Sequence, residues 1–172
     1  MPLPHEGVHP PVTVNPGSNP QPFVVGAGAS RFGEVVKFLG VHPNDLKISS
    51  KDTGGALSMF DYTGLGKVGP MLHIHFEQDE VFTVVSGRYR FKVGDELKEL
   101  GAGDTIFLPR GIPHTWIQLT DRGRLIYFLQ PAGKMEEFFS TMNKMAGPPS
   151  TEEMDRIHAA HQMKVVGPPL SL

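Results

Sequence analysis

From Phe23 to Leu129 the chain is cut into apolar segments that are too short for most helices. The segments are rich in Val, Ile, Phe and Thr, and Gly, Asp or Pro follows each of them within a few residues. A typical strand needs only about five or six residues, so this pattern predicts an all-β domain. The expected strands lie near residues 35–39, 56–62, 71–76, 80–85, 89–93, 96–100, 105–108, 114–119 and 124–129.

The two ends of the chain differ from this central region. Seven prolines fall in residues 1–22, and because proline lacks an amide hydrogen, the stretch predicts an extended arm. After Pro131 the apolar residues recur at spacings of three and four, which predicts a helix packed against the sheet. These residues are Met135, Phe138, Phe139, Met142 and Met145. The predicted organisation is an arm (1–22), a β-domain (23–131) and a helical extension (132–172).

A second helix is expected beyond the first one. A Gly-Pro-Pro stretch at residues 147–149 ends the first helix, and Ser150 with Glu153 predicts a capping box for a helix that reaches roughly residue 163. His158 and His161 lie three residues apart on this helix, close enough to share a metal. We expect them to be solvated surface histidines, because polar side chains on a helix are more often exposed than ligating.

Composition narrows the classes of partner. The formal net charge is −2, from 16 basic and 18 acidic residues, and there is no run of Lys or Arg. We therefore expect no nucleic-acid partner and no membrane partner. No stretch reaches the roughly 18 apolar residues of a membrane span, and no signal peptide is evident, which predicts a cytoplasmic protein. The proline-rich arm and an open sheet edge predict a homodimer.

The segment MLHIHFEQDE, residues 71–80, carries the first part of a metal-binding pattern. Side chains alternate along a strand, so His73 and His75 project from one face, and Glu80 follows five residues later. His114 begins another expected strand in the segment PRGIPHTWIQ, residues 109–118. The chain has no cysteine. Three imidazoles and one carboxylate suit one divalent transition metal (Fe, Mn, Ni, Co, Cu or Zn), with one or two coordination positions left open for water, substrate or dioxygen.

These residues resemble the two motifs of the cupins. The first motif is a glycine, then HxH, three or four residues, Glu, six residues and Gly; the second is G, five residues, PxG, two residues, H, three residues and Asn. The matching positions are His73, His75, Glu80, Gly87, Gly103, Pro109, Gly111 and His114. The opening glycine is either Gly66 or Gly69, and Gln118 stands in place of the closing Asn. The resemblance covers about residues 66–118.

The resemblance implies a single-domain cupin, a jelly-roll β-barrel (double-stranded β-helix), here with C-terminal helices. It also implies one metal per chain, held inside the barrel by His73, His75, Glu80 and His114. The expected substrate-pocket residues are Phe82, Tyr89, Phe91, Trp116 and Gln118. The four aromatic residues among them are equally compatible with ordinary barrel core. Gln118 is in addition a candidate for orienting the ligand imidazoles.

Within the cupins, the chain is most similar to small single-barrel proteins like quercetin dioxygenase, in its glutamate-bearing motif and in the run PAGKMEEFFSTM at residues 131–142. This resemblance implies a metal-dependent dioxygenase that acts on a small oxygen-rich aromatic or enolic substrate, with Glu80 as general base. Two alternatives use the same ligands: a metal-dependent isomerase or decarboxylase, and a non-catalytic cupin that binds a small ligand. Cupins host many unrelated activities, so the fold leaves this choice open.

Overall fold

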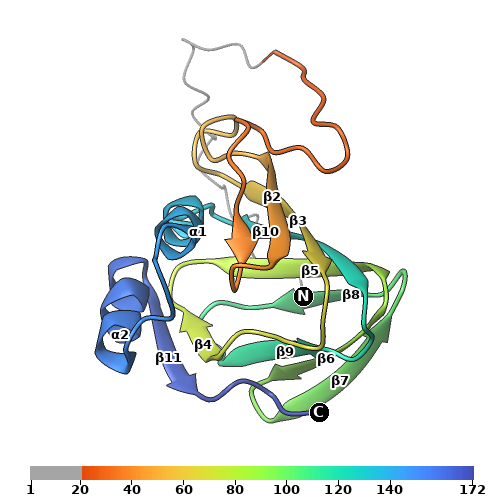
Figure 1. Ribbon diagram of the computed structural model, residues 1–172, viewed down its shortest axis with the longest axis vertical. Coiled ribbons are helices and arrows are strands. Elements are labelled where there is room, and N and C mark those ends of the chain that lie inside the picture. Colours follow the sequence, from red (N-terminus) through yellow and green to blue (C-terminus); the bar gives the residue numbers. More distant parts are fainter. Residues whose placement is uncertain (1–20) are drawn as a thin grey trace, which may run out of the picture.

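Two antiparallel sheets face each other in the computed structural model, which describes residues 21–172 (Figure 1). The six-stranded sheet has the order β1 (Lys37–Phe38), β2 (His42–Ile48), β3 (Ser58–Gly64), β10 (Gly123–Gln130), β5 (Asp79–Ser86) and β8 (Thr105–Leu108). The five-stranded sheet has the order β11 (Met163–Gly167), β4 (Leu72–His75), β9 (His114–Gln118), β6 (Arg88–Val93) and β7 (Glu96–Gly101). Within residues 21–172 every strand pairing stays inside one sheet. The architecture is therefore a sandwich, and the expected barrel is not closed by strand pairing.

The alternation of side chains along β5 and β10 builds one wall of the core. Phe82 and Val84 point inward from β5, and their partners in register on β10 are Tyr127 and Leu125. All four are at most 6% exposed. From the opposite sheet, Tyr89, Phe91 and Trp116 complete a mainly aromatic core. Each large ring buries about 150–250 Å², so this cluster is the main source of hydrophobic stabilisation.

Each of the nine expected strands overlaps an observed one, but the chain forms two further strands. β2 has the sequence HPNDLKI, in which Pro, Asn and Asp are all depleted in strands. It nevertheless pairs with β3, and its Pro43 lies on the side of β1, a strand of only two residues. β11 lies in the segment that was expected to be purely helical. Its pairing with β4 gives it a place at the edge of the five-stranded sheet.

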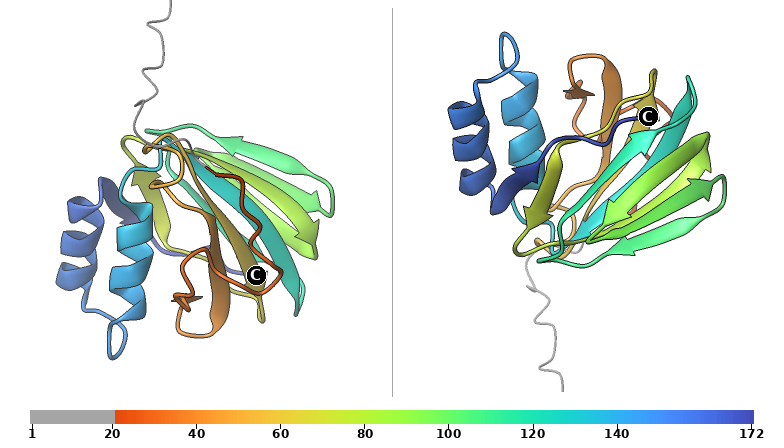
Figure 2. Two further views of the ribbon diagram at one scale, coloured as in Figure 1. Left: turned by 90° about the horizontal axis from the view of Figure 1, so that it is seen from above. Right: turned by 90° about the horizontal axis from the view of Figure 1, so that it is seen from below.

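Two helices, α1 (Met135–Asn143) and α2 (Thr151–Ala160), lie beside each other on one side of the sandwich (Figure 2). The prediction that α1 packs its apolar side against the sheet is confirmed, because Met135 is buried and Phe138 and Phe139 contact the core. The predicted cap of α2 is present: the Ser150 hydroxyl accepts a hydrogen bond from the Glu153 amide. The expected helix end near residue 163 is wrong, because α2 stops at Ala160 and Gln162 adopts a φ of 63°.

The expectation for the histidines of the second helix is also wrong. His158 and His161 are only 7% and 5% exposed, and both rings stand edge-on to Phe138. Their Nδ1 atoms lie within hydrogen-bond distance of the carbonyls of Met154 and Ile157. The packing of α2 against α1 therefore buries two side chains that helix periodicity alone assigned to the surface.

Two expectations concern the ends of the chain and the membrane. Of the proline-rich arm expected at residues 1–22, residues 1–20 lie outside the described part of the structure. No helix among residues 21–172 is long and apolar enough to cross a membrane.

Candidate metal centre

Four side chains that could hold a metal ion meet between the two sheets: His73, His75, Glu80 and His114, whose potential ligand atoms all lie within 4.8 Å of one another. His73 and His75 share the inner face of β4, and His73 is the partner in register of His114 on the neighbouring β9. Glu80 reaches the group from β5 in the opposite sheet. The packing of one sheet on the other therefore completes a group that no single sheet holds.

An oxygen acceptor faces the Nδ1 atom of every ligand imidazole. The His73 Nδ1 lies 2.7 Å from the Met71 carbonyl, and the His114 Nδ1 lies 3.0 Å from the Ile112 carbonyl. The His75 Nδ1 lies 3.3 Å from the Gln78 Oε1. Because a carbonyl oxygen only accepts, these contacts place the proton of each neutral ring on Nδ1. The Nε2 atoms are thus left with lone pairs, the form in which histidine binds a metal.

These lone pairs face one another without a proton to share. The Nε2 atoms of His73 and His75 are 3.2 Å apart, and the His114 Nε2 is 3.0 Å from the Glu80 Oε2. In each pair both atoms are acceptors once the Nδ1 atoms carry the protons, so neither pair forms a hydrogen bond without an extra proton. A cation between the four atoms would satisfy all of them, and this is the strongest sign that the residues fit a metal.

The distances also suit a single transition metal. Donors bound about 2.0–2.2 Å from one ion lie roughly 2.8–3.6 Å apart at angles from 90° to tetrahedral, and about 4.0–4.4 Å apart when they are opposite. The two short contacts of 3.0 and 3.2 Å fall in the first range. The 3.7 Å between the His75 Nε2 and the Glu80 Oε1 lies between the two values. The chain thus contains a group of three histidines and one glutamate that is capable of binding one metal ion; its donor atoms do not identify the metal.

Electrostatics keep the ligands in their metal-binding protonation states. Burial of the ring, with repulsion from His114 and His75, lowers the pKa of His73 to about 3. Burial likewise lowers the pKa of His75. Burial raises the pKa of Glu80, but the attraction that the neighbouring imidazoles exert on its carboxylate when they carry an extra proton outweighs this and brings the pKa down to about 2. At neutral pH the site therefore combines the neutral rings of His73 and His75 with the ionised carboxylate of Glu80.

Gln78 is the residue of this site that sequence reasoning missed. Its amide is fully buried, and its Nε2 donates a 3.3 Å hydrogen bond to the Gln162 Oε1, next to β11. Its position between His75 and Glu80 was the available signal, but the run EQDE is typical of a solvated turn. Gln118, the expected orienting residue, instead accepts a hydrogen bond from the Tyr89 hydroxyl and donates one to the Thr120 carbonyl. It contacts no ligand imidazole among its described hydrogen bonds.

The structure also separates the two candidates for the opening glycine. A Cβ at Gly69 would lie 1.7 Å from the carbonyl oxygen of Trp116, whereas a Cβ at Gly66 would meet only the His42 ring, at 3.7 Å. Only glycine allows the loop to pass this close to β9. Gly69, three residues before His73, is therefore the position that requires a glycine.

The five expected pocket residues all lie in the interior of the sandwich. Phe82, Tyr89, Phe91, Trp116 and Gln118 are at most 7% exposed. Four of them, the aromatic residues, pack on one another with ring centroids 5.5–6.5 Å apart. Their contacts are those of a filled core, and their role in substrate binding stays a prediction.

The protonation states predict how acid affects the metal-free protein. The pKa of His73 is 6.5 in the unfolded chain and about 3 in the folded protein, so between these two pH values only the unfolded chain binds a proton at this ring. The contribution of His73 to the free energy of unfolding is therefore fully present above pH 6.5 and is lost as the pH falls below it. From pH 7 to pH 5 we expect His73 to lower the free energy of unfolding by about 2 kcal/mol. Urea denaturation of metal-free wild type and of His73→Asn at both pH values measures this.

The variant should lose a correspondingly smaller amount of stability on acidification than wild type does. Glu152→Gln, which changes an exposed carboxylate on α2, serves as the control and should behave like wild type. An equal loss of stability in wild type and His73→Asn would contradict the neutral state assigned to this ring.

Comparisons with known proteins agree with this geometry. The sequence profile described as Cupin domain matches residues 64–129. An uncharacterized protein of Streptomyces coelicolor is 33% identical over 54 residues, or 31% of this chain, and the chain spans about half (51%) of that relative. The crystal structure of an RmlC-like cupin from Shewanella frigidimarina is 23% identical with a TM-score of 0.52, over 60% of this chain and 87% of that one. Residues 64–129 thus match the cupin domain profile, and the chain has the cupin fold.

Proposed function

We propose that this protein is a mononuclear metal-dependent dioxygenase that acts on a small oxygen-rich aromatic or enolic compound. The observation that carries the proposal is the set of four converging ligand atoms, whose lone pairs at 3.0 and 3.2 Å need a cation between them. Three imidazoles and one carboxylate leave one or two positions on a first-row metal for other ligands. The substrate class rests on the similarity of the first motif to that of the quercetin dioxygenase-like cupins.

A bound metal would supply a Lewis acid that holds the substrate oxygen and, where it is redox-active, a route for electrons to dioxygen. The protein supplies the base. Glu80 is ionised at neutral pH and is one of the four residues that would hold the metal, so its carboxylate could accept the proton of the hydroxyl of a substrate bound at the same ion. Its partners in register, Leu108 and Leu129, are fully buried and exclude water from the carboxylate.

Dioxygen uptake tests this proposal. Protein loaded with Fe, Mn, Ni or Co is offered flavonols, diketones and catechols in an oxygen electrode. We expect one of these classes to be consumed with dioxygen, and Glu80→Gln to lower the rate per bound metal about 100-fold or more, because general-base catalysis typically contributes 10²–10⁴. Glu77→Gln removes a neighbouring exposed carboxylate and should leave the rate unchanged.

The remaining outcomes would each reject the dioxygenase. Turnover that proceeds equally well without dioxygen would indicate an isomerase or decarboxylase. Ligand binding that survives removal of the metal, without turnover, would indicate a binding protein. If no dioxygen is taken up with any of these metals and substrate classes, the metal site does not have dioxygenase activity.

We also propose that the protein forms a homodimer through the outer face of the six-stranded sheet. Four residues from four adjacent strands lie in register across this face: Met59, Phe128, Val81 and Phe107. Phe107 is 58% exposed, and it lies on β8, which is one of the two edge strands of this sheet. An apolar row that ends at an open edge is the kind of surface that a second copy can cover.

Sedimentation velocity tests the dimer. Wild type should sediment with twice the chain mass of 18.8 kDa, and Phe107→Lys should shift it to monomer by placing a charge in the apolar row. Leu97→Lys, at a side chain that is 61% exposed on β7 in the other sheet, is the matched control and should stay dimeric. A wild-type monomer, or a dimer that Phe107→Lys does not weaken, would contradict this interface.

A further inference from the structure

His75 differs from the other two imidazoles of the metal centre in the kind of acceptor that faces its Nδ1 atom. His73 and His114 each face a main-chain carbonyl, whereas His75 faces the Oε1 of the Gln78 side chain at 3.3 Å. A carbonyl can only accept a hydrogen bond, but a side-chain amide has an acceptor at one end and donors at the other. The tautomer of His75 therefore depends on which end of the Gln78 amide is turned toward the ring.

The Gln78 amide is enclosed between His75 and the C-terminal segment. Gln78 is 0% exposed, and a Cβ at Gly133 would lie 1.8 Å from its Nε2, so only a glycine leaves room for the amide at that point. The same Nε2 donates a 3.3 Å hydrogen bond to the Gln162 Oε1. Among residues 21–172, His75 and Gln162 are the hydrogen-bond partners of this side chain, so these two determine how the amide is oriented.

The two contacts of Gln78 can run in either of two directions. In the first, which the structure shows, the His75 Nδ1 donates to the Gln78 Oε1, and the Gln78 Nε2 donates to the Gln162 Oε1. In the second, both amides are turned over, so that Gln162 donates to Gln78 and Gln78 donates to His75. The His75 Nδ1 is then an acceptor, and the proton of the neutral ring lies on Nε2. Only the first direction leaves the Nε2 lone pair that a metal needs.

Gln162 is fixed in its main chain but exposed to solvent. Its carbonyl accepts a 3.0 Å hydrogen bond from the Phe76 amide, and the next residue, Met163, is the partner in register of His75. Because Gln162 is exposed, water can satisfy the end of its amide that does not face Gln78. Residue 162 is thus a surface position from which the orientation of a buried amide can be changed.

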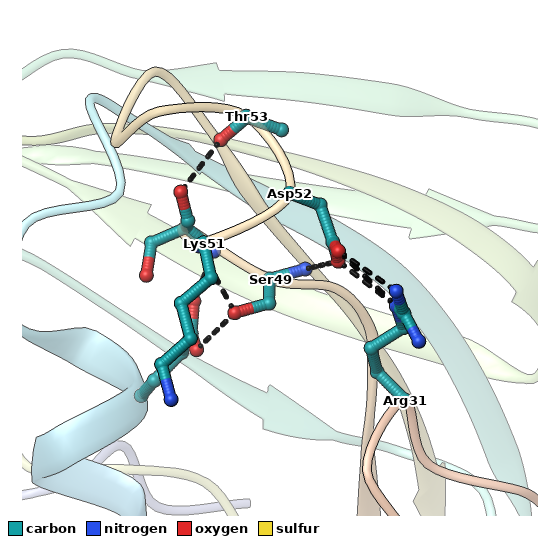
Figure 3. A network of polar contacts seen from close by, with 7 residues as sticks. Arg31, Ser49, Lys51, Asp52 and Thr53 are labelled. Carbon is teal, nitrogen blue, oxygen red and sulfur yellow. Dashed lines mark hydrogen bonds and ion pairs between the residues drawn. The ribbon is translucent and has the colours of Figure 1, made fainter. Parts of the chain in front are cut away.

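The helices that precede Gln162 are anchored by a polar network in the loop after β2 (Figure 3). Asp52 accepts hydrogen bonds from the Ser49 amide and the Arg31 guanidinium, and the Ser49 hydroxyl donates to Glu136 of α1. α2 packs on α1, and Gln162 follows α2 after one residue. The acceptor side chain is therefore presented by a segment that is already in place, which lowers the entropy cost of the contact.

We propose that Gln162 is a positioning residue for the metal centre: by accepting a hydrogen bond from Gln78, it holds His75 in the tautomer whose Nε2 binds a metal. Gln162 lies outside residues 64–129, the part of the chain that matches the cupin domain profile. The proposal rests on the metal binding that the proposed function requires, but on no particular substrate or reaction. It gives the C-terminal segment a role in the state of a buried ligand.

Two substitutions with opposite hydrogen-bonding character test the proposal. Gln162→Glu presents only acceptors at this position, and Gln162→Lys presents only donors, on side chains of similar length. The φ of 63° at residue 162 strains both variants alike. In Gln162→Lys the ammonium group donates to the Gln78 Oε1, which turns the Gln78 Nε2 toward the His75 Nδ1. Gln162→Glu keeps the acceptor and therefore the wild-type orientation.

The first measurement is the tautomer of His75 in metal-free, full-length protein at neutral pH, taken from long-range nitrogen–proton NMR spectra of the ring. A protonated ring nitrogen and an unprotonated one differ widely in nitrogen chemical shift. We expect the proton on Nδ1 in wild type and in Gln162→Glu, and on Nε2 in Gln162→Lys. His73, which faces the Met71 carbonyl, should keep its proton on Nδ1 in all three proteins.

The second measurement is the affinity for zinc, by competition with a chelator. The dissociation constant should rise about 10–100-fold in Gln162→Lys, as is typical when the partner of a ligand imidazole is lost, and should not rise in Gln162→Glu. Val166→Lys adds the same charge at a position on β11 that is 40% exposed. This control should leave both the tautomer of His75 and the zinc affinity unchanged.

Three results would overturn the proposal. The first is a His75 tautomer that is the same in wild type and in Gln162→Lys, which would mean that residue 162 does not set it. The second is an equal change in Val166→Lys, which would assign the effect to charge alone. The third is an unchanged zinc affinity in Gln162→Lys despite a changed tautomer. None of these measurements uses dioxygen or a substrate, so a failure of the proposed dioxygenase would leave their outcome unaffected.

Discussion

The structure depends on the contact of a carboxylate from one sheet with imidazoles from the other. Glu80 stands on β5 and the three histidines on β4 and β9, so the ligand set exists only when the sheets are packed and in register. The Nδ1 acceptors then determine which lone pairs face inward. Two of these acceptors are backbone carbonyls two residues before the histidine that they orient, at Met71 and Ile112. The ligand geometry is thus built largely into the strands themselves.

This arrangement is costly without a cation. Neutral imidazoles and an ionised carboxylate are held in a buried site where lone pairs face each other, and buried polar groups without partners destabilise a fold. The aromatic core beside the site offsets that cost. Binding of a metal to the folded chain alone would add stability by mass action. The same residues can therefore limit the stability of the metal-free protein and support that of the metal-bound form.

Segments outside the matched cupin domain also shape the centre. β11 pairs with β4, with Met163 opposite His75 and Val165 opposite His73, and Gln162 accepts the hydrogen bond of Gln78. Figure 1 shows β11 lying between α2 and β4. The C-terminal segment is thus a wall of the site as well as a cover of the sandwich.

The convergence of His73, His75, Glu80 and His114 could be predicted from sequence because a strand has a fixed period of two, and because HxH, Glu and His each occupy a motif position. β2 could not be predicted, because Pro43, Asn44 and Asp45 disfavour a strand and only its pairing with β3 outweighs that preference. The hydrogen-bond acceptors of His73 and His114 could not be predicted either, since they are backbone carbonyls, which every residue has. His158 and His161 are buried because α2 packs on α1. The periodicity of the α2 sequence alone does not show which neighbouring helix covers these side chains.

The most direct test of this account is the metal content of untagged protein, determined by inductively coupled plasma mass spectrometry. After reconstitution, the account predicts about one transition-metal ion per chain in wild type and almost none in the double variant His73→Ala with His114→Ala. A second double variant, His5→Ala with His9→Ala, removes two histidines outside the ligand set and should keep its metal. Equal metal content in wild type and in His73→Ala with His114→Ala would contradict the central claim that these side chains hold the ion.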